Sequence, residues 1–282
     1  MKLRAHATVA TAITALDDAL NRLANATNTG SDETMRDSFL RTHDELESRL
    51  ANTFDRSDVI ALLQTARYWH LMQTYLGPTE RNLLHIARPV NMAVSQECDA
   101  LKTALTAHRE AFADLSKWLA LPGLLVLADT NVMIHCLPID QIDWRTALKD
   151  HARDLAPRIL VPLPVIDEID RKKFEAGGGT ARRAKAAIAS LRTLREGVRA
   201  GQPAQVKAAN GSIVSLEIPR HDVGRVPLSR VDDELIDYGQ FLARTGTRPV
   251  VVVTRDYGIE TRATWSDLQL VWLDEKYQKD QE

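Results

Sequence analysis

Five short apolar runs alternate with helical patterns between about residue 121 and residue 282. The runs are LLVLAD at 124–129, RILVPL at 158–163, SIVSLEI at 212–218, PVVVVT at 249–254 and LQLVWL at 268–273. Most are too short for helices and rich in β-branched residues, whereas the segments between them have helical spacing. This alternation predicts an α/β domain with a parallel sheet that is covered by helices on both faces.

The first 120 residues have a different pattern. Apolar residues recur there at spacings of three and four, around 10–23, 39–50 and 59–76, and no run alternates like a strand. Gly77-Pro78 is expected to end the third helix, and Thr79 to cap the next one. We therefore expect an all-α antiparallel bundle at 1–120 and the α/β domain at 121–282, joined at Pro122-Gly123.

Composition narrows the class of protein and its setting. The chain has 36 Lys and Arg and 38 Asp and Glu residues, a net charge of −2, so any preference for nucleic acid must be local. The spacing of Cys98 and Cys136 fits neither a zinc site nor a disulfide framework, which favours a reduced, cytoplasmic setting. No stretch reaches the ~18 apolar residues of a membrane span, so no membrane association is expected.

Acidic residues follow the predicted strands or open nearby helical segments. Asp129 ends the first run, Glu168 lies early in the helix after the second run, and Asp256 follows the fourth. Asp232 and Asp233 begin the helical segment before the fourth run. Because ligands of parallel sheets bind at the carboxyl ends of the strands, we expect these carboxylates to gather at that edge.

Carboxylates that share a crevice repel one another and raise each other's pKa values. No lysine falls among these positions, so another positive group has to balance the charge. Mg²⁺ and Mn²⁺ are hard cations that prefer oxygen ligands. The pattern therefore predicts a Mg²⁺ or Mn²⁺ site.

Taken alone, each acid has a simpler explanation. Glu168 and Asp233 stand where the helix dipole favours acids anyway, and Asp256 can be a turn residue. Asp129 fits such explanations least, because helical residues follow it directly and burying an unpaired carboxylate costs several kcal/mol. The metal hypothesis rests on the ordered set.

This ordered set resembles the PIN domain, a metal-dependent nuclease fold, over roughly residues 124–275. The motifs that carry the resemblance are DTNVMIH, VIDEID, VDDELI and VVTRD. The segment 164–191 and the long gap before DDELI are more similar to the larger PIN domains of RNA-processing enzymes than to the compact toxin type. The resemblance implies a Mg²⁺- or Mn²⁺-dependent endoribonuclease, with DNA as the alternative substrate.

The family motifs also imply roles for individual residues. Asp129, Glu168, Asp233 and Asp256 match the catalytic acids that bind the metal, and Asp232 matches an accessory metal ligand. Asn131 and Thr254 match polar positions that support these acids. The sequence ETRA at 260–263 departs from the R-x-K-A stretch that often follows the last aspartate, so one expected basic residue is acidic.

The chemistry implied by such a ligand set is hydrolysis of a phosphodiester bond by an in-line water. One or two metal ions roughly 4 Å apart supply the activation of the water and the stabilisation of charge, so no histidine base is required. The products would carry 5′-phosphate and 3′-hydroxyl ends. We interpret His135, on an apolar helix face, as a packed or solvent-edge histidine.

A basic run follows Glu168. Between residues 171 and 199, nine basic and two acidic residues give a net charge of +7. Such a run is usually a solvated helix face, but beside an acidic crevice it also fits a track for a phosphate backbone. The residues assigned to nucleic-acid binding are Arg171, Lys172, Lys173, Arg182, Arg183 and Lys185.

Three alternatives stay open. One is a phosphatase of the haloacid-dehalogenase type, which also begins with an aspartate after a strand but needs a second acid where Asn131 stands. Another is a catalytically silent PIN-like module that binds RNA or protein. In the helical half, Arg36 and His43 have the R-x6-H spacing of a metal-independent ribonuclease motif, although chance explains such a pair well. That half is otherwise expected to serve oligomerisation, a protein partner or access of the substrate.

Overall fold

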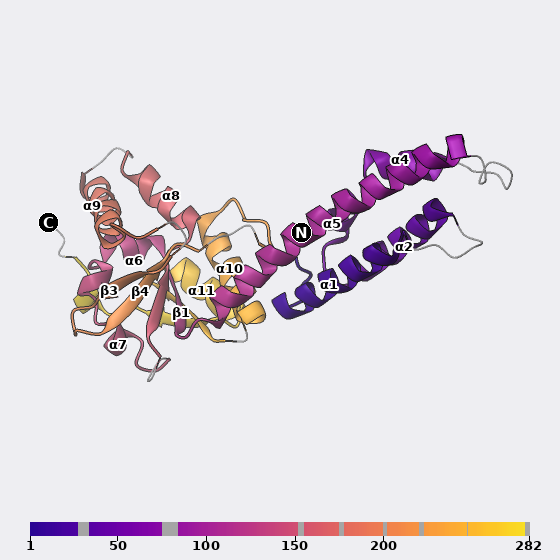
Figure 1. Cartoon of the computed structure of the whole chain (residues 1–282). Coiled ribbons are helices and arrows are strands. Elements are labelled where there is room, and N and C mark those ends of the chain that lie inside the picture. Colours follow the sequence, from indigo (N-terminus) through magenta and orange to yellow (C-terminus); the bar gives the residue numbers. More distant parts are fainter. Residues whose placement is uncertain are drawn as a thin grey trace. The chain divides into compact units, whose positions relative to one another are not determined.

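The computed structural model describes residues 1–27, 34–74, 84–151, 155–174, 178–199, 202–219, 223–246 and 248–279 (Figure 1). Gly77-Pro78 and Thr79, the predicted helix end and cap, lie outside these residues. The chain divides into two compact units. The helical unit comprises Met1–Leu119 with Val223–Arg225, and the sheet unit comprises Ala120–Asp222 with Val226–Glu282.

The helical unit contains five described helices. They are α1 (Val9–Asn25), α2 (Met35–Leu50), α3 (Arg56–Leu63), α4 (Ala66–Gln73) and α5 (Leu84–Ala120). Side-chain oxygens of Thr8, Thr34, Asp55 and Thr65 accept hydrogen bonds from backbone N–H groups in the first turns of α1 to α4. These caps satisfy donors that a helix leaves unpaired, and they explain where each helix begins.

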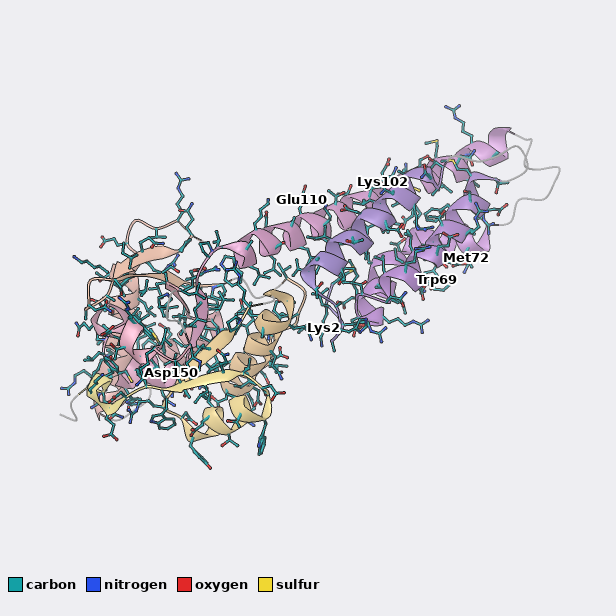
Figure 2. All side chains as sticks on the ribbon, turned by 90° about the horizontal axis from the view of Figure 1, so that it is seen from below. Lys2, Trp69, Met72, Lys102, Glu110 and Asp150 are labelled. Carbon is teal, nitrogen blue, oxygen red and sulfur yellow. The ribbon has the colours of Figure 1, made fainter. Side chains whose placement is uncertain are left out.

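The prediction of one continuous helix over the third apolar stripe, residues 59–76, is wrong. The structure breaks it at Gln64, because Thr65 caps a new helix with its hydroxyl. The change of direction leaves Trp69 and Met72 on the surface, with exposed fractions of 49% and 43% (Figure 2). The two residues therefore do not belong to the buried stripe.

The Arg36 and His43 pair is structural. His43 is buried, stacks on the Tyr68 ring at 3.9 Å, and one ring nitrogen lies 3.0 Å from the Leu63 carbonyl oxygen. Burial lowers its pKa. Arg36 donates to the carbonyls of Leu71 and Met72. A buried histidine cannot reach a nucleic-acid substrate, so the helical ribonuclease motif finds no support.

The sheet unit has one six-stranded sheet in the order β3-β4-β2-β1-β5-β6. Its strands are β1 (Leu124–Ala128), β2 (Pro157–Leu160), β3 (Ala204–Lys207), β4 (Ile213–Glu217), β5 (Val250–Thr254) and β6 (Gln269–Trp272). All neighbouring strands are parallel except β3 and β4. The predicted α/β class, a helical region followed by a mostly parallel sheet with flanking helices, is confirmed.

In the sheet unit, helices connect most of the strands along the chain (Figure 1). They are α6 (Thr130–His135), α7 (Trp144–Ala147), α8 (Leu163–Lys172), α9 (Gly178–Leu194), α10 (Val231–Gly246) and α11 (Tyr257–Trp265). Short 3-10 turns lie at Ile139–Gln141 and Glu275–Tyr277. Among the described helices of both units, none is long and apolar enough to cross a membrane.

Strand β1 lies between β2 and β5, and all five of its residues are buried. Its last residue, Ala128, is in register with Val253 of β5. Burial on both faces explains why β1 and β5 read as continuous apolar runs without alternation. The residue after β1 therefore emerges at the carboxyl edge in the middle of the sheet.

Strand β3 was not predicted. It forms a hairpin with β4, and the turn carries Asn210 and Gly211, with a positive φ of 80° at the glycine. The Asn210 side chain accepts hydrogen bonds from the backbone and hydroxyl of Ser212. An Asn-Gly pair between two alternating segments is the ordinary signal of such a turn, and β3 shows alternating burial.

A buried ion pair joins β2 to β4. Arg158 donates from Nε and Nη2 to the two carboxylate oxygens of Glu217 at 2.8 and 2.9 Å, and both side chains are about 5% exposed. Arg158 also donates to the Leu121 carbonyl, which ties the start of the sheet unit to β2. A Cβ at Gly123 would meet the Arg158 side chain at 2.8 Å, so glycine makes room for this pair.

Removing one partner of this pair should destabilise the sheet unit. Arg158→Met leaves Glu217 buried without its cation, and we expect the free energy of unfolding to fall by about 3–5 kcal/mol in urea denaturation. The matched control is Arg192→Met, which removes an exposed arginine of α9. Equal stability of the two variants would contradict a structural role for the pair.

Candidate active site

Asp129 stands directly after β1 and is only 2% exposed. Its Oδ2 accepts a hydrogen bond of 2.8 Å from the Thr254 hydroxyl, and its backbone N–H donates to the Val253 carbonyl. Burial raises the pKa of Asp129 to about 7, with further contributions from the negative charges of Asp256 and Asp232. The Thr254 hydrogen bond opposes this shift but does not cancel it.

Asp256 begins α11 and is held from three sides. Its Oδ1 accepts from the backbone N–H groups of Gly258 and Ile259, at 2.7 and 3.3 Å. Its Oδ2 accepts from the Asn131 side chain at 3.0 Å. The Thr254 oxygen also accepts from the Asp256 backbone N–H at 2.9 Å, so one hydroxyl fixes Asp129 and Asp256 together.

Both polar residues expected to support the acids therefore contact them. Asn131 lies on α6 and Thr254 ends β5, so two elements far apart in sequence are bridged at the carboxyl edge. Thr130 is a third support that the sequence analysis missed. Its hydroxyl donates to Glu168 at 2.6 Å. The position of Thr130, directly after Asp129 and in the first turn of the helix, could have indicated this role.

Glu168 lies on α8, which begins after Pro162. Besides Thr130, its carboxylate has two basic neighbours: Lys172 Nζ at 3.3 Å and Arg171 Nη2 at 3.8 Å. Both follow Glu168 on α8 at the spacing of one helical turn. Glu168 is thus held between α6 and the basic end of its own helix.

Asp232 and Asp233 open α10 and contact the same arginine. Arg262 of α11 lies 3.6 Å from Asp232 and 3.2 Å from Asp233, and Arg230 lies 3.6 Å from Asp233. Burial raises the pKa of Asp232. Arg262 opposes the shift, and the charges of Asp256 and Glu168 add to it. Asp232 thus interacts with the other acids.

No lysine falls at these positions in the sequence, but the folded chain brings basic side chains to three of the acids. Arg262 balances Asp232 and Asp233, and Lys172 balances Glu168. The reason is tertiary, because Arg262 approaches from a different helix. In the described part of the chain, no lysine, arginine or histidine forms an ion pair with Asp129 or Asp256.

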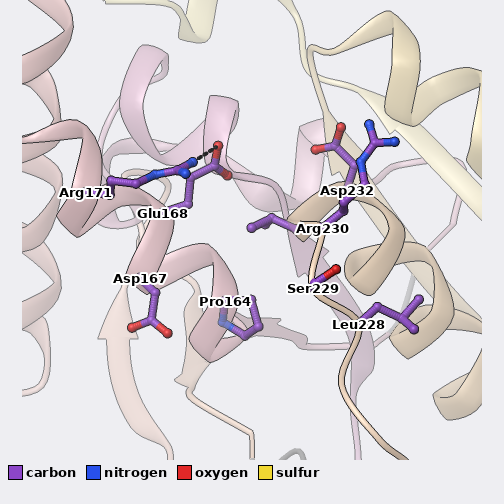
Figure 3. A pocket seen from close by; sticks show the side chains of 9 residues that line it. Pro164, Asp167, Glu168, Arg171, Leu228, Ser229, Arg230 and Asp232 are labelled. Carbon is purple, nitrogen blue, oxygen red and sulfur yellow. Dashed lines mark ion pairs between the residues drawn. The ribbon is translucent and has the colours of Figure 1, made fainter. Parts of the chain in front are cut away.

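A pocket of about 590 Å³ lies between α8 and the start of α10. Figure 3 shows Glu168 and Arg171 on one side of it and Arg230 and Asp232 on the other. The described loop before α10 is held by the buried Glu234, which accepts from the Leu228 backbone N–H at 2.7 Å. Two of the site's acids, Glu168 and Asp232, thus line this space from opposite sides.

The fit of a divalent cation depends on the atoms that these residues offer. The donors are all carboxylate oxygens, which suits Mg²⁺ or Mn²⁺, and the buried Asp129 lacks a described cationic partner. Among the described residues, no three His, Cys, Asp or Glu side chains are already gathered around one point as a finished metal centre. The donor chemistry of these residues fits such an ion.

The residues assigned to nucleic-acid binding occupy α8 and α9. Arg171, Arg182 and Lys185 are exposed, Lys172 pairs with Glu168, and Lys173 pairs with Asp170. Arg183 is half-buried, and its Nη1 lies 3.3 Å from Nδ1 of His135. Tyr257, next to Asp256, is 76% exposed. Three of these cations are thus exposed on α8 and α9, and one exposed aromatic ring follows Asp256.

A family model described as PIN domain matches residues 126–272, slightly more than half of the chain. The matched segment begins inside β1 and ends at the last residue of β6, so it contains all five acids of the candidate site. No curated protein matches the sequence.

The raised pKa of Asp129 makes a prediction for stability. The folded pKa of about 7 lies above the ordinary value of 3.8, so the folded state binds the proton more tightly and loses stability as pH rises from about 4 to 7. Asp129→Asn removes this loss while keeping an oxygen for Thr254. In metal-free buffer we expect the variant to be more stable above pH 7 by about 4 kcal/mol, since each unit of pKa shift is worth about 1.4 kcal/mol.

The measurement is urea denaturation of both proteins at a series of pH values. The advantage of Asp129→Asn should vanish below about pH 4, where the aspartate is protonated in both states. Asp170→Asn, at an exposed acid of α8, should show no such trend. A variant that is less stable than the parent at every pH would contradict the buried, destabilising carboxylate.

Proposed function

This chain belongs to the PIN domain family, a nuclease-type fold, and we therefore propose that its sheet unit hydrolyses phosphodiester bonds of RNA with the help of Mg²⁺ or Mn²⁺. Asp129, Glu168, Asp232, Asp233 and Asp256 would hold the metal. DNA is the alternative substrate. The resemblance of 164–191 and the gap before DDELI to the larger RNA-processing PIN domains supports RNA and an endonucleolytic mode.

The observation that carries this proposal is the state of Asp129. A carboxylate that is almost fully buried at the end of the central strand destabilises the fold when it is ionised. Two further carboxylates add to this cost, and no described basic residue pairs with Asp129. A cation bound at this edge would reduce the repulsion between the carboxylates. The unfavourable burial of Asp129 is then explained as a requirement for binding that cation.

The protein's own part is to position oxygen atoms. Thr254 fixes Asp129 and Asp256 relative to each other, while Asn131 holds the second oxygen of Asp256. Thr130 holds Glu168 of α8 against the first turn of α6. When bound, a divalent cation would lower the pKa of a water molecule and stabilise the charge that develops on the phosphate.

Arg262 has two uses in this proposal. In the structure its guanidinium forms ion pairs with Asp232 and Asp233, and its charge opposes the burial that raises the pKa of Asp232. Its five N–H donors also suit a phosphate oxygen, so a substrate that enters the site meets a cation at the edge of the acidic group. The departure from R-x-K-A at Glu260 therefore leaves one strong basic residue, Arg262, in place.

The haloacid-dehalogenase alternative loses its remaining support. Such an enzyme needs an acid two residues after the first aspartate, whereas Asn131 stands there and donates to Asp256. The silent-scaffold alternative differs from a nuclease by one measurable property, since it would bind RNA or protein without cleaving RNA.

The helical unit is proposed to serve a protein partner or a second copy of the chain. Its described surface exposes Trp69, Met72 and Met92, the last at 54%. A reduced, cytoplasmic setting agrees with two buried, unpaired cysteines whose thiol pKa values burial raises to about 11.

Asp129→Asn should abolish metal-dependent cleavage. We expect the parent to cleave labelled single-stranded RNA with Mn²⁺, to stop in EDTA, and to leave 5′-phosphate ends. Removing one catalytic metal ligand should lower the rate by at least ~10²-fold, because the charge stabilisation it supports is removed as well. Asp170→Asn is the matched control and should keep the parent's rate. A parent that is inactive on RNA and DNA with either metal would favour the silent scaffold.

Arg182→Ala combined with Lys185→Ala should weaken RNA binding whatever the sequence of the RNA. Both side chains are exposed on α9, and removing each cation that binds a phosphate should lower the salt slope of binding by about one unit. Binding is measured by fluorescence anisotropy over a range of salt concentrations. An unchanged slope would mean that these residues form an ordinary solvated face.

A further inference from the structure

A second charged cluster lies where α6, α8, α9 and the C-terminal segment meet. Four basic side chains contribute to it: Lys172, Arg183, Lys279 and His135. Arg183 Nη1 is 3.3 Å from His135 Nδ1, and the electrostatic effects of Arg183, Lys172 and Lys279 are all felt at His135. We call this group the basic cluster.

Lys279 is fixed in place by backbone pairing. The backbone N–H of Lys279 donates to the His135 carbonyl at 3.0 Å, and the Leu137 N–H donates to the Tyr277 carbonyl at 2.7 Å. Lys279 Nζ donates to the Ile134 carbonyl at 3.3 Å. Its stem lines a small cavity of about 70 Å³ beside residues of α6 and α9. The ammonium group is therefore held close to α6 instead of extending into solvent.

Within the basic cluster, the positive charge of Lys279 is not balanced by a described acidic residue. No described aspartate or glutamate forms an ion pair with Lys279, which is half-buried. Burial lowers its pKa, and the charge of Arg183 lowers it further, although the Cys136 thiol acts in the opposite direction. Two neighbouring cations with partial burial favour an anionic ligand.

His135 adds a directed donor. An arginine can only donate, so Nδ1 of His135 must accept, and the ring proton is then on Nε2. Burial and the neighbouring cations lower the pKa of His135, which keeps the ring neutral at pH 7. The ring therefore offers an N–H donor without adding another positive charge to the cluster.

Lys172 connects the basic cluster to the acids. Its Nζ lies 3.3 Å from Glu168, and its charge is among those that act on His135. An anion at the basic cluster would therefore lie next to the proposed metal ligands. In a nucleic acid, the anion beside a reacting phosphodiester is the neighbouring phosphate of the same strand.

We propose that Lys279, Arg183 and His135 form a binding site for one backbone phosphate of the nucleic-acid strand, adjacent to the bond that is cleaved. This inference rests on the proposed nuclease function and adds residues of the C-terminal segment to the substrate site. The site fixes the register of the strand relative to the acids, since a phosphate held there sets which phosphodiester reaches them.

The test compares full-length variants in RNA binding. Fluorescence anisotropy with single-stranded RNA in EDTA is measured over a range of salt concentrations for Lys279→Gln, Arg183→Gln and the double variant. Each single variant should bind about 5- to 10-fold more weakly. Because the salt slope counts phosphates and both cations share one phosphate, the double variant should lower the slope by only about one unit.

Three controls separate this site from general charge and from unfolding. Lys207→Gln, at an exposed lysine of β3, should bind like the parent. Lys279→Arg keeps the charge and should restore binding. Asp280→Asn with Glu282→Gln tests whether the chain's own C-terminal acids occupy the site, in which case RNA binding would strengthen and the inference would be overturned.

Three further results would contradict the proposed phosphate site. A parent that binds no RNA, a Lys279→Gln variant that binds like Lys207→Gln, or a double variant with an additive loss of two slope units would overturn the shared phosphate site. The proposed function is judged separately by Mn²⁺-dependent cleavage with the parent protein. Binding that follows the expected pattern without cleavage would refute the nuclease and keep the phosphate site.

Discussion

The hydrogen bond between Thr254 and Asp129 joins the ends of the neighbouring strands β5 and β1, and the rest of the site depends on it. It forms because the sheet order places β1 beside β5, with Ala128 and Val253 in register. The same hydroxyl oxygen accepts the Asp256 N–H, so a second carboxylate is fixed by the same residue. A buried carboxylate at this position is energetically unfavourable by itself, and a bound cation would offset the cost of burying its charge.

Charge in the site is divided between the chain and its proposed ligands. Arg262 and Lys172 offset the acids of α10 and α8, whereas Asp129 and Asp256 rely on neutral donors such as Thr254 and Asn131. This division leaves the negative charge concentrated at the centre of the edge, where a metal is proposed. Positive charge collects at the basic cluster, where a substrate phosphate is proposed.

Much of the sheet and of the candidate site could be predicted from the sequence, because strands that are buried on both faces form continuous apolar runs. The runs that became β1 and β5 were recognisable for that reason, and the order of the acids after them indicated the site. Strand β3 was missed because a short edge strand with alternating exposure lacks such a run. The break before α4 depends on one capping hydroxyl, at Thr65, inside a continuous apolar stripe. The approach of Arg262 to α10 and that of Lys279 to α6 join residues distant in sequence, which no local pattern encodes.

Calorimetric titration of the full-length protein with Mn²⁺ tests the central claim most directly, because it measures metal binding without any assumption about the substrate. The account predicts that the parent and Asp170→Asn bind Mn²⁺ with similar affinity, and that Asp129→Asn loses at least about tenfold in affinity, because a buried ligand charge is gone. Equal binding of Mn²⁺ by Asp129→Asn and the parent, or no binding by either, would contradict the account.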